Sequence, residues 1–246
     1  MTIYFIVLFM SALLAGLLVL IVPKANSKLY KLALVFAGSY LFAITIIHIL
    51  PELYSTATDP IMVGVYVLAG FFLQQFLEYF TSGAEHGHIH THGEGHKHSM
   101  GTAVLLLIAL LIHSFLEGSL LAHPSDNHAH HESTSLLAGI VLHKAPAAFA
   151  LMSILLCHTS KKIAILFLVI FALGSPLGMI IGDYYVENNI LSMAAFTTLF
   201  AIVSGNFLHI STTIVFESSE NHDFNIRKIG VALLGAFIAV AAEFWF

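Results

Sequence analysis

Hydrophobic residues form long blocks along this chain, and short polar segments separate the blocks. A helix of about 20 apolar residues spans the hydrocarbon core of a bilayer. The pattern predicts eight such helices, at Ile3–Val22, Leu29–Leu50, Ile61–Phe80, Ala103–Leu121, Leu136–Cys157, Ile163–Ile181, Ile190–Ile210 and Ile226–Trp245. Because the connecting segments are too short for a soluble domain, we expect a single all-α transmembrane domain over residues 1–246.

Composition supports a membrane protein. Of the 246 residues, 58% are hydrophobic and 9% are charged, whereas soluble domains carry about a quarter charged residues. The first block lacks a basic leader and an Ala-x-Ala site, so we expect a retained helix rather than a signal peptide. The small net charge of -5 argues against a nucleic-acid partner, and the single Cys157 excludes an intrachain disulfide.

Positive charges lie on alternate loops. Eight of the nine Lys and Arg residues fall on the odd-numbered loops: Lys24, Lys28, Lys31, Lys97, Lys161, Lys162, Arg227 and Lys228. The positive-inside rule makes those loops cytoplasmic. We therefore expect both termini to be extracytoplasmic and the chain to lie in a plasma (inner) membrane. The ninth positive charge, Lys144, lies inside the fifth block.

The cytoplasmic loop 81–100 is rich in histidine. It holds His86, His88, His90, His92, His96 and His98, and the outer loop near residue 128 holds four more histidines. Flexible imidazole clusters bind zinc, copper or nickel with modest selectivity. The alternative is a solvated low-complexity linker, and the residues alone leave both interpretations open.

Two polar residues, His113 and Glu117, lie one helical turn apart inside the fourth block. A charged residue at the membrane centre costs about 2.5–3.5 kcal/mol or more, and residues spaced i,i+4 project from one helix face. A bound metal cation would compensate both, with His143 of the next block as a third ligand and Ser114 beside them. A set of two His and one Glu suits a reversibly bound divalent transition metal. The alternative is a protonated Glu117 in a buried polar crosslink.

Prolines interrupt two of the predicted spans. Pro146 lies inside the fifth, where it frees the Leu142 carbonyl, and Ser175 and Pro176 lie in a Gly-Ser-Pro-Leu-Gly run of the sixth. Freed carbonyls are tolerated at membrane depth where they line a cavity, so such interruptions indicate a substrate path. A packing seam of small residues would explain the sixth span equally well.

Two further polar sets remain open to two interpretations each. Asn206, His209 and Thr213 share a face of the seventh span and either line a pathway or bridge helices. His48 and Glu52, near the outer end of the second span, either form an entrance site that collects cations or cap the interface.

Several motifs in this chain resemble those of a known family. His113-Ser-Phe-Leu-Glu-Gly118 looks like the His-[Asn/Ser]-x-x-Glu-Gly signature of the ZIP (Zrt, Irt-like protein) metal-ion transporters. His143-Lys-Ala-Pro146, Ser175-Pro-Leu-Gly178 and His48-Ile-Leu-Pro51 also resemble family features. The resemblance covers essentially the whole chain.

The resemblance implies import of divalent metal, with zinc as the leading ion and iron, manganese or cadmium as alternatives. It implies an elevator-like motion, in which spans one, four, five and six slide against spans two, three, seven and eight. Many members of the family are thought to be dimers, so a homodimer is one possible assembly. We expect a protein that is not an enzyme and that needs no resident cofactor.

Departures from the family pattern bear on the number of ions. Binuclear members carry acidic residues where this chain has Lys144, Ala147 and Ser175, and Ser114 replaces the commoner Asn. Each change removes an oxygen ligand, and Lys144 adds a cation. We therefore hypothesise a mononuclear site, in which Lys144 either substitutes for the second ion or closes the site by pairing with Glu117.

Functions other than import remain as alternatives. A metal efflux protein or a membrane metal sensor would need the same ligands. A membrane metal-dependent hydrolase or hydroxylase is disfavoured because the His-Glu-x-x-His motif and any nucleophile with a paired base are absent. Two imidazole ligands exclude Mg²⁺ and Ca²⁺ as the preferred ion.

Overall fold

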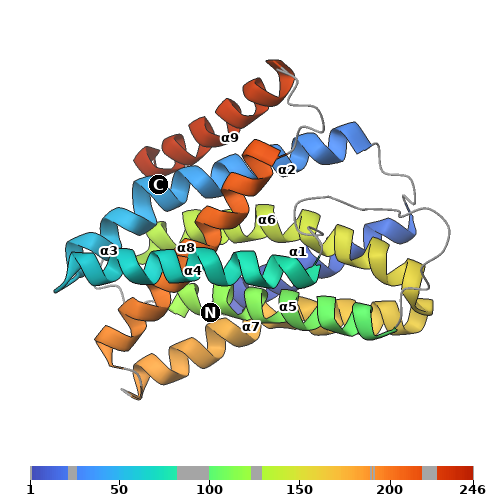
Figure 1. The fold of residues 1–246 in the computed structure, drawn as a ribbon, viewed down its shortest axis with the longest axis horizontal. Coiled ribbons are helices and arrows are strands. Elements are labelled where there is room, and N and C mark those ends of the chain that lie inside the picture. Colours follow the sequence, from blue (N-terminus) through green and yellow to red (C-terminus); the bar gives the residue numbers. More distant parts are fainter. Residues whose placement is uncertain are drawn as a thin grey trace.

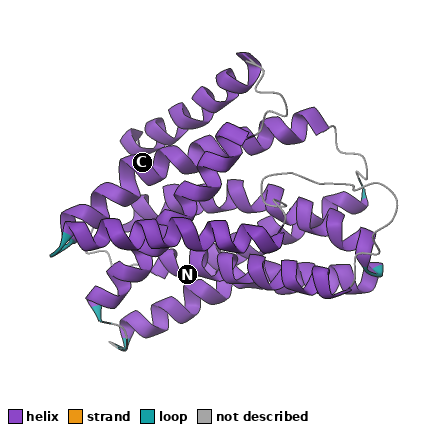
Figure 2. Ribbon diagram, viewed as in Figure 1, coloured by secondary structure: helices purple, strands orange, loops and turns teal. Residues whose placement is uncertain are grey.

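The computed structural model describes residues 2–21, 27–81, 100–122, 129–188, 190, 192–217 and 226–245. Within these ranges the regular elements are all helices (Figure 2). In chain order they are α1 (Thr2–Leu17), η1 (Leu18–Leu20), α2 (Ser27–Ile44), η2 (Thr45–Ile49), α3 (Leu50–Thr56), α4 (Pro60–Thr81), α5 (Met100–Ser119), η4 (Leu120–Ala122), α6 (Ala129–His158), α7 (Lys161–Glu187), α8 (Met193–Glu217) and α9 (Ile226–Trp245).

The described helices form eight long segments, because α2, η2 and α3 follow one another without a break. Within the described residues, six stretches are long and apolar enough to cross a membrane: Thr2–Leu20, Lys31–Ser55, Pro60–Tyr79, Leu136–Leu156, Lys161–Glu187 and Ala194–Val215. Leu107–Ala122 of α5 and η4 is a shorter apolar helix. The all-α arrangement of eight helices agrees with the one predicted from the hydrophobic blocks.

Local signals explain where two of the helices begin. The Asp59 carboxylate accepts hydrogen bonds from the backbone N–H groups of Ile61 (3.0 Å) and Met62 (3.2 Å), and Pro60 opens α4. The Ser160 hydroxyl accepts from the backbone N–H of Ile163 at the start of α7. Each cap satisfies amide groups that lack a partner within the helix.

Apolar side chains cover the outside of the bundle, and several polar side chains lie inside it. Ile61 is 79% exposed and Phe237 is 68% exposed, whereas Glu117 and Lys144 are each 1% exposed. Such a surface suits contact with lipid chains rather than water. The buried polar groups are therefore the places to search for function.

Glycines allow two helix pairs to approach closely. A Cβ atom added at Gly118 of α5 would lie 2.0 Å from the Ser175 backbone oxygen of α7, and one at Gly178 would lie 2.0 Å from that of Phe115. Between α4 and α8, a Cβ at Gly70 would lie 1.8 Å from the Ile202 oxygen. Small residues at helix crossings allow backbones to touch, as is common in membranes. Figure 1 shows α5 and α7 side by side along one edge of the bundle.

Candidate metal centre

Helices α5 and α6 bring His113, Glu117 and His143 together in the interior. One ligand atom from each residue lies within 4.8 Å of the other two. The Glu117 Oε1 atom is 2.9 Å from His113 Nε2 and 3.6 Å from His143 Nε2. All three side chains are at most 4% exposed. The i,i+4 spacing within α5 aligns the first two ligands, and the packing of α6 against α5 supplies the third.

The chemistry of this cluster suits a divalent transition metal. Zinc binds imidazole nitrogen and carboxylate oxygen at about 2.0–2.2 Å, so ligand atoms around one tetrahedral ion lie about 3.4 Å apart. The distances from Glu117 Oε1 to the two imidazole nitrogens, 2.9 and 3.6 Å, lie on either side of that value. The two imidazole rings are nearly perpendicular, at 84°, with centroids 5.7 Å apart, so they approach Glu117 from different directions.

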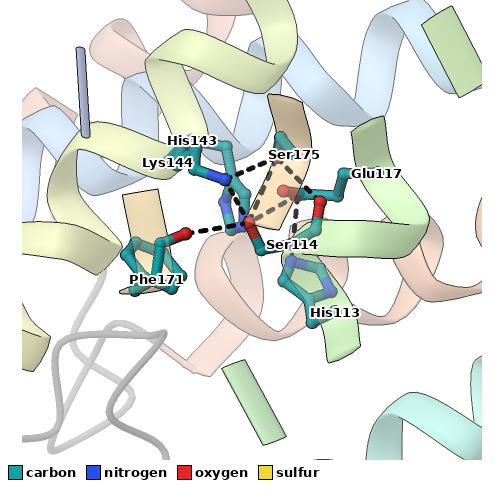
Figure 3. A network of polar contacts seen from close by, with 7 residues as sticks. All are labelled: His113, Ser114, Glu117, His143, Lys144, Phe171 and Ser175. Carbon is teal, nitrogen blue, oxygen red and sulfur yellow. Dashed lines mark hydrogen bonds and ion pairs between the residues drawn. The ribbon is translucent and has the colours of Figure 1, made fainter. Parts of the chain in front are cut away.

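Lys144 follows His143 but contacts a different set of groups (Figure 3). Its ammonium donates to the hydroxyls of Ser114 on α5 and Ser175 on α7, and it lies 4.9 Å from the centroid of the Phe171 ring. Ser175 Oγ in turn donates to the Ser114 backbone oxygen at 2.7 Å. Among the described residues no carboxylate oxygen lies within 4.0 Å of the Lys144 ammonium. The structure thus holds no direct ion pair between Lys144 and Glu117, and whether the lysine substitutes for a second ion or closes the site stays a prediction.

The two prolines lie inside continuous helices. Helix α6 runs through Pro146, and α7 runs through Pro176. Ser175, which precedes that proline, is fully buried and contacts Lys144, so this part of α7 borders the centre. Kinks at these prolines remain a prediction.

Two residues of the polar stripe of α8, Asn206 and His209, contact α4, whereas the Thr213 hydroxyl donates to the His209 oxygen within α8. His209 Nε2 lies 3.6 Å from Glu78 Oε2, and its ring packs edge-on against Phe71 with centroids 4.8 Å apart. The Asn206 amide, with its nitrogen turned toward α4, donates to the Gly70 oxygen at 2.6 Å. These contacts support the helix-bridging interpretation of the stripe.

His48 lies in η2, and Glu52 lies one turn later in α3. His48 Nε2 is 3.8 Å from Glu52 Oε2, and His48 Nδ1 is 2.9 Å from Glu243 Oε1 of α9. The predictions from the sequence include neither Glu243 nor Glu78. A usable signal existed, because each is a lone carboxylate in a strongly apolar helix, where an ionised group is costly.

The histidines of loop 81–100 lie outside the described residues. This applies to His86, His88, His90, His92, His96 and His98. Their role as metal ligands therefore stays a prediction from the sequence.

Comparison with known proteins identifies the family. Residues 81–242 match the family model described as ZIP Zinc transporter. The chain is also 29% identical over 174 residues to "Protein zntD" of Dictyostelium discoideum, an alignment that covers 66% of this chain and 25% of that protein. The chain thus spans about a quarter of the length of this curated relative.

The matched region contains α5, α6, α7 and α8, and with them all three residues of the cluster. The matched family consists of membrane transporters and not of enzymes, which confirms the prediction that the chain is not an enzyme. The family match, a helical bundle with an apolar exterior and a buried His–Glu–His cluster lead to one conclusion. This chain is an all-α polytopic membrane protein that belongs to the ZIP zinc transporter family.

Proposed function

We propose that the chain imports divalent transition-metal ions, zinc above all, into the cytoplasm through one intramembrane site. The observation that carries this proposal is the cluster of His113, Glu117 and His143, whose ligand atoms lie within 4.8 Å of one another inside a bundle of apolar helices. Iron, manganese and cadmium are alternative cargo, because the same nitrogen and oxygen ligands accept them. Three protein ligands leave one position of the ion open, which favours release.

The surroundings of Lys144 support a single ion per site. The ammonium is held by two hydroxyls and an aromatic face, which together replace water around a buried cation. A second dication near this position would meet a fixed positive charge and no further described carboxylate. Lys144 therefore acts in place of the second metal ion of binuclear members.

The packing supports an elevator-like motion of two helix groups. One proposed group consists of α1, α5, α6 and α7, and the other of α2, α3, α4, α8 and α9. The close glycine contacts join α5 to α7, α1 to α7, α4 to α8 and α2 to α9, so each contact lies within one group. Between the groups, a Cβ at Gly139 of α6 would meet Tyr40 of α2 at an ordinary 3.4 Å. An apolar cluster with members from both groups fills this boundary. An apolar boundary with ordinary side-chain contacts would allow the two helix groups to slide past each other.

The charges of the loops support the proposed orientation. With the odd-numbered loops cytoplasmic, both termini are extracytoplasmic, loop 81–100 faces the cytoplasm, and the host membrane is a plasma or inner membrane. Labelling of single cysteines introduced into loops, in a Cys157→Ser background, tests this arrangement. A homodimer is tested by the mass of the purified protein in detergent.

Zinc uptake into proteoliposomes loaded with a zinc-sensitive dye tests the proposed function. We expect the parent chain to admit zinc, and His113→Ala, Glu117→Ala and His143→Ala each to lower the initial rate at least tenfold. Glu187→Ala, which removes an exposed carboxylate at the end of α7, serves as a matched control and retains uptake. Equal rates in the parent and Glu117→Ala would contradict the proposal. Expression in cells separates import from efflux, because an exporter lowers cell zinc.

A further inference from the structure

A second cluster of ligand-type side chains joins η2 and α3 to the last turn of α9, a helix that packs along α2 (Figure 1). His48 of η2, Glu52 of α3 and Glu243 of α9 form it. His48 and Glu52 repeat the His-x-x-x-Glu spacing of the central pair, so two turns of this chain carry the same ligand pattern. Unlike the central ligands, which are at most 4% exposed, Glu52 and Glu243 are 26% and 29% exposed. The second cluster therefore lies partly at the surface of the bundle, in contrast to the buried central one.

The geometry assigns different roles to the two ring nitrogens of His48. Nδ1 lies 2.9 Å from Glu243 Oε1, and an ionised carboxylate only accepts hydrogen bonds, so Nδ1 carries the proton. In the neutral ring, Nε2 then presents its lone pair. Nε2 faces Glu52 Oε2 at 3.8 Å, which is too long for a hydrogen bond and close to the 3.4 Å or so that separates two ligands of one tetrahedral zinc ion.

This arrangement is the one that metal-binding histidines use. A ligating imidazole almost always donates its other N–H to a carboxylate, a backbone carbonyl or water, which fixes the tautomer and the ring orientation. Here Glu243 would orient His48, and His48 Nε2 with Glu52 would hold the ion, with water in the remaining positions. The cluster carries two carboxylates, and their charge also favours a dication.

The local backbone explains how His48 reaches this position. Pro51 near the start of α3 has no N–H to donate to the Ile47 carbonyl, so the α-helical ladder is interrupted there. The five residues Thr45–Ile49 form a π-helical segment instead. Such segments are rare and frequently mark functional sites. Glu243 lies 195 residues away in the chain, so packing of α9 against α2 completes the cluster.

We propose that His48 and Glu52 form a second binding site for a divalent transition metal, with Glu243 as the positioning residue. The site is peripheral, partly exposed and weaker than the central one, because it offers two protein ligands instead of three. The proposal goes beyond the transport function and does not depend on it. The peripheral site would bind a cation even if the central cluster did not transport metal.

Zinc binding to the purified full chain tests the proposal. The ten histidines of the two histidine-rich segments, six in 86–98 and four in 123–131, are first replaced by serine, because they would otherwise add sites. We expect this background chain to bind two zinc ions in equilibrium dialysis. His48→Ala and Glu52→Ala should each leave one ion, and His113→Ala should also leave one. A count that His48→Ala and Glu52→Ala do not change, in protein with a normal unfolding transition, would overturn the proposal.

The role of Glu243 is tested by affinity rather than by count. Loss of an orienting carboxylate typically weakens metal binding about 10–100-fold. We expect Glu243→Ala to raise the Kd of the weaker site by that factor while two ions still bind at saturation. Glu243→Gln should recover part of the loss, because the amide oxygen still accepts from Nδ1–H. Glu187→Ala is the matched carboxylate control, and an unchanged Kd in Glu243→Ala would refute the positioning role.

The two proposals fail in distinguishable ways. If only the central cluster is wrong, His113→Ala leaves the zinc count unchanged while His48→Ala lowers it. If only the peripheral site is wrong, the background chain binds one ion, which His113→Ala removes and His48→Ala does not.

Discussion

At the scale of single residues, Lys144 bears on how many ions the proposed metal centre can hold. A buried ammonium is costly unless several groups replace its water shell. Ser114 and Ser175 supply hydroxyls from two neighbouring helices, and Phe171 supplies a ring face. The lysine therefore lies beside the cluster without contacting Glu117, which leaves that carboxylate available to an ion.

Replacing this lysine by a carboxylate should convert the centre to a two-ion site. The background for this test is the chain with the ten histidines replaced by serine and with His48→Ala. We expect this background to bind one zinc ion per chain, and the same chain with Lys144→Asp to bind two, because an oxygen ligand replaces the positive charge. Equilibrium dialysis measures the count.

Lys144→Leu is the control for that exchange, since it removes the charge without adding a ligand and should still bind one ion. A single ion bound by Lys144→Asp would contradict the surrogate role of the lysine.

At the scale of elements, the contact between α5 and α7 decides whether the centre holds together. Ser114 and Ser175 meet across this contact, and Gly118 and Gly178 allow it by removing any side chain between the backbones. The same contact carries part of a second apolar cluster, whose members come from α1, η1, α5, α6 and α7. These helices thus behave as one packed unit around the centre.

A methyl group at Gly118 should disturb this unit. Its Cβ would lie 2.0 Å from the Ser175 backbone oxygen, so the two helices must separate. Overpacking of this kind typically costs about 1–3 kcal/mol. We expect Gly118→Ala to lower the thermal unfolding midpoint in detergent and to slow zinc uptake, because Ser175 moves with α7.

Gly230→Ala on α9 is the matched control, because a Cβ there meets nothing within 4 Å. If Gly118→Ala unfolds at the same temperature as Gly230→Ala, the close contact of α5 and α7 does not contribute to stability as argued.

At the scale of the whole molecule, two tightly packed helix groups meet at an apolar boundary. Their internal contacts rest on backbone approach at glycines, which cannot slide without steric conflict. The boundary between α2 and α6 has ordinary side-chain contacts instead, at Tyr40 and Gly139. The proposed sliding of the two helix groups would therefore take place at this boundary.

Bridging that boundary should stop transport without abolishing binding. In a Cys157→Ser background, we expect a bifunctional thiol reagent to block zinc uptake by the Tyr40→Cys/Gly139→Cys chain while its zinc-binding stoichiometry is unchanged. Uptake in proteoliposomes and equilibrium dialysis measure the two properties.

The matched control is Gly16→Cys/Leu168→Cys, which also pairs a glycine with a large residue but lies within one group, between α1 and α7. Its bridge should leave uptake intact. Full uptake by the bridged Tyr40→Cys/Gly139→Cys chain would argue against sliding at this boundary.

The sequence by itself determined the features that are local to one helix. A bilayer leaves backbone groups no partner except their own helix, so long apolar blocks predict helices reliably. Spacing of four residues places His113 and Glu117 on one face, so this pair was predictable from α5 alone. The family signature around the pair follows from the same short stretch.

Only the tertiary structure decided which groups meet across helices. The Lys144 ammonium contacts Ser175 rather than Glu117 because α7 packs closely on α5, and His209 faces Glu78 because α8 packs on α4. Glu243 reaches His48 across 195 residues of chain. The hydrophobic pattern specifies that each helix forms but not its rotation or its neighbours, and these depend on side-chain packing that involves the whole bundle.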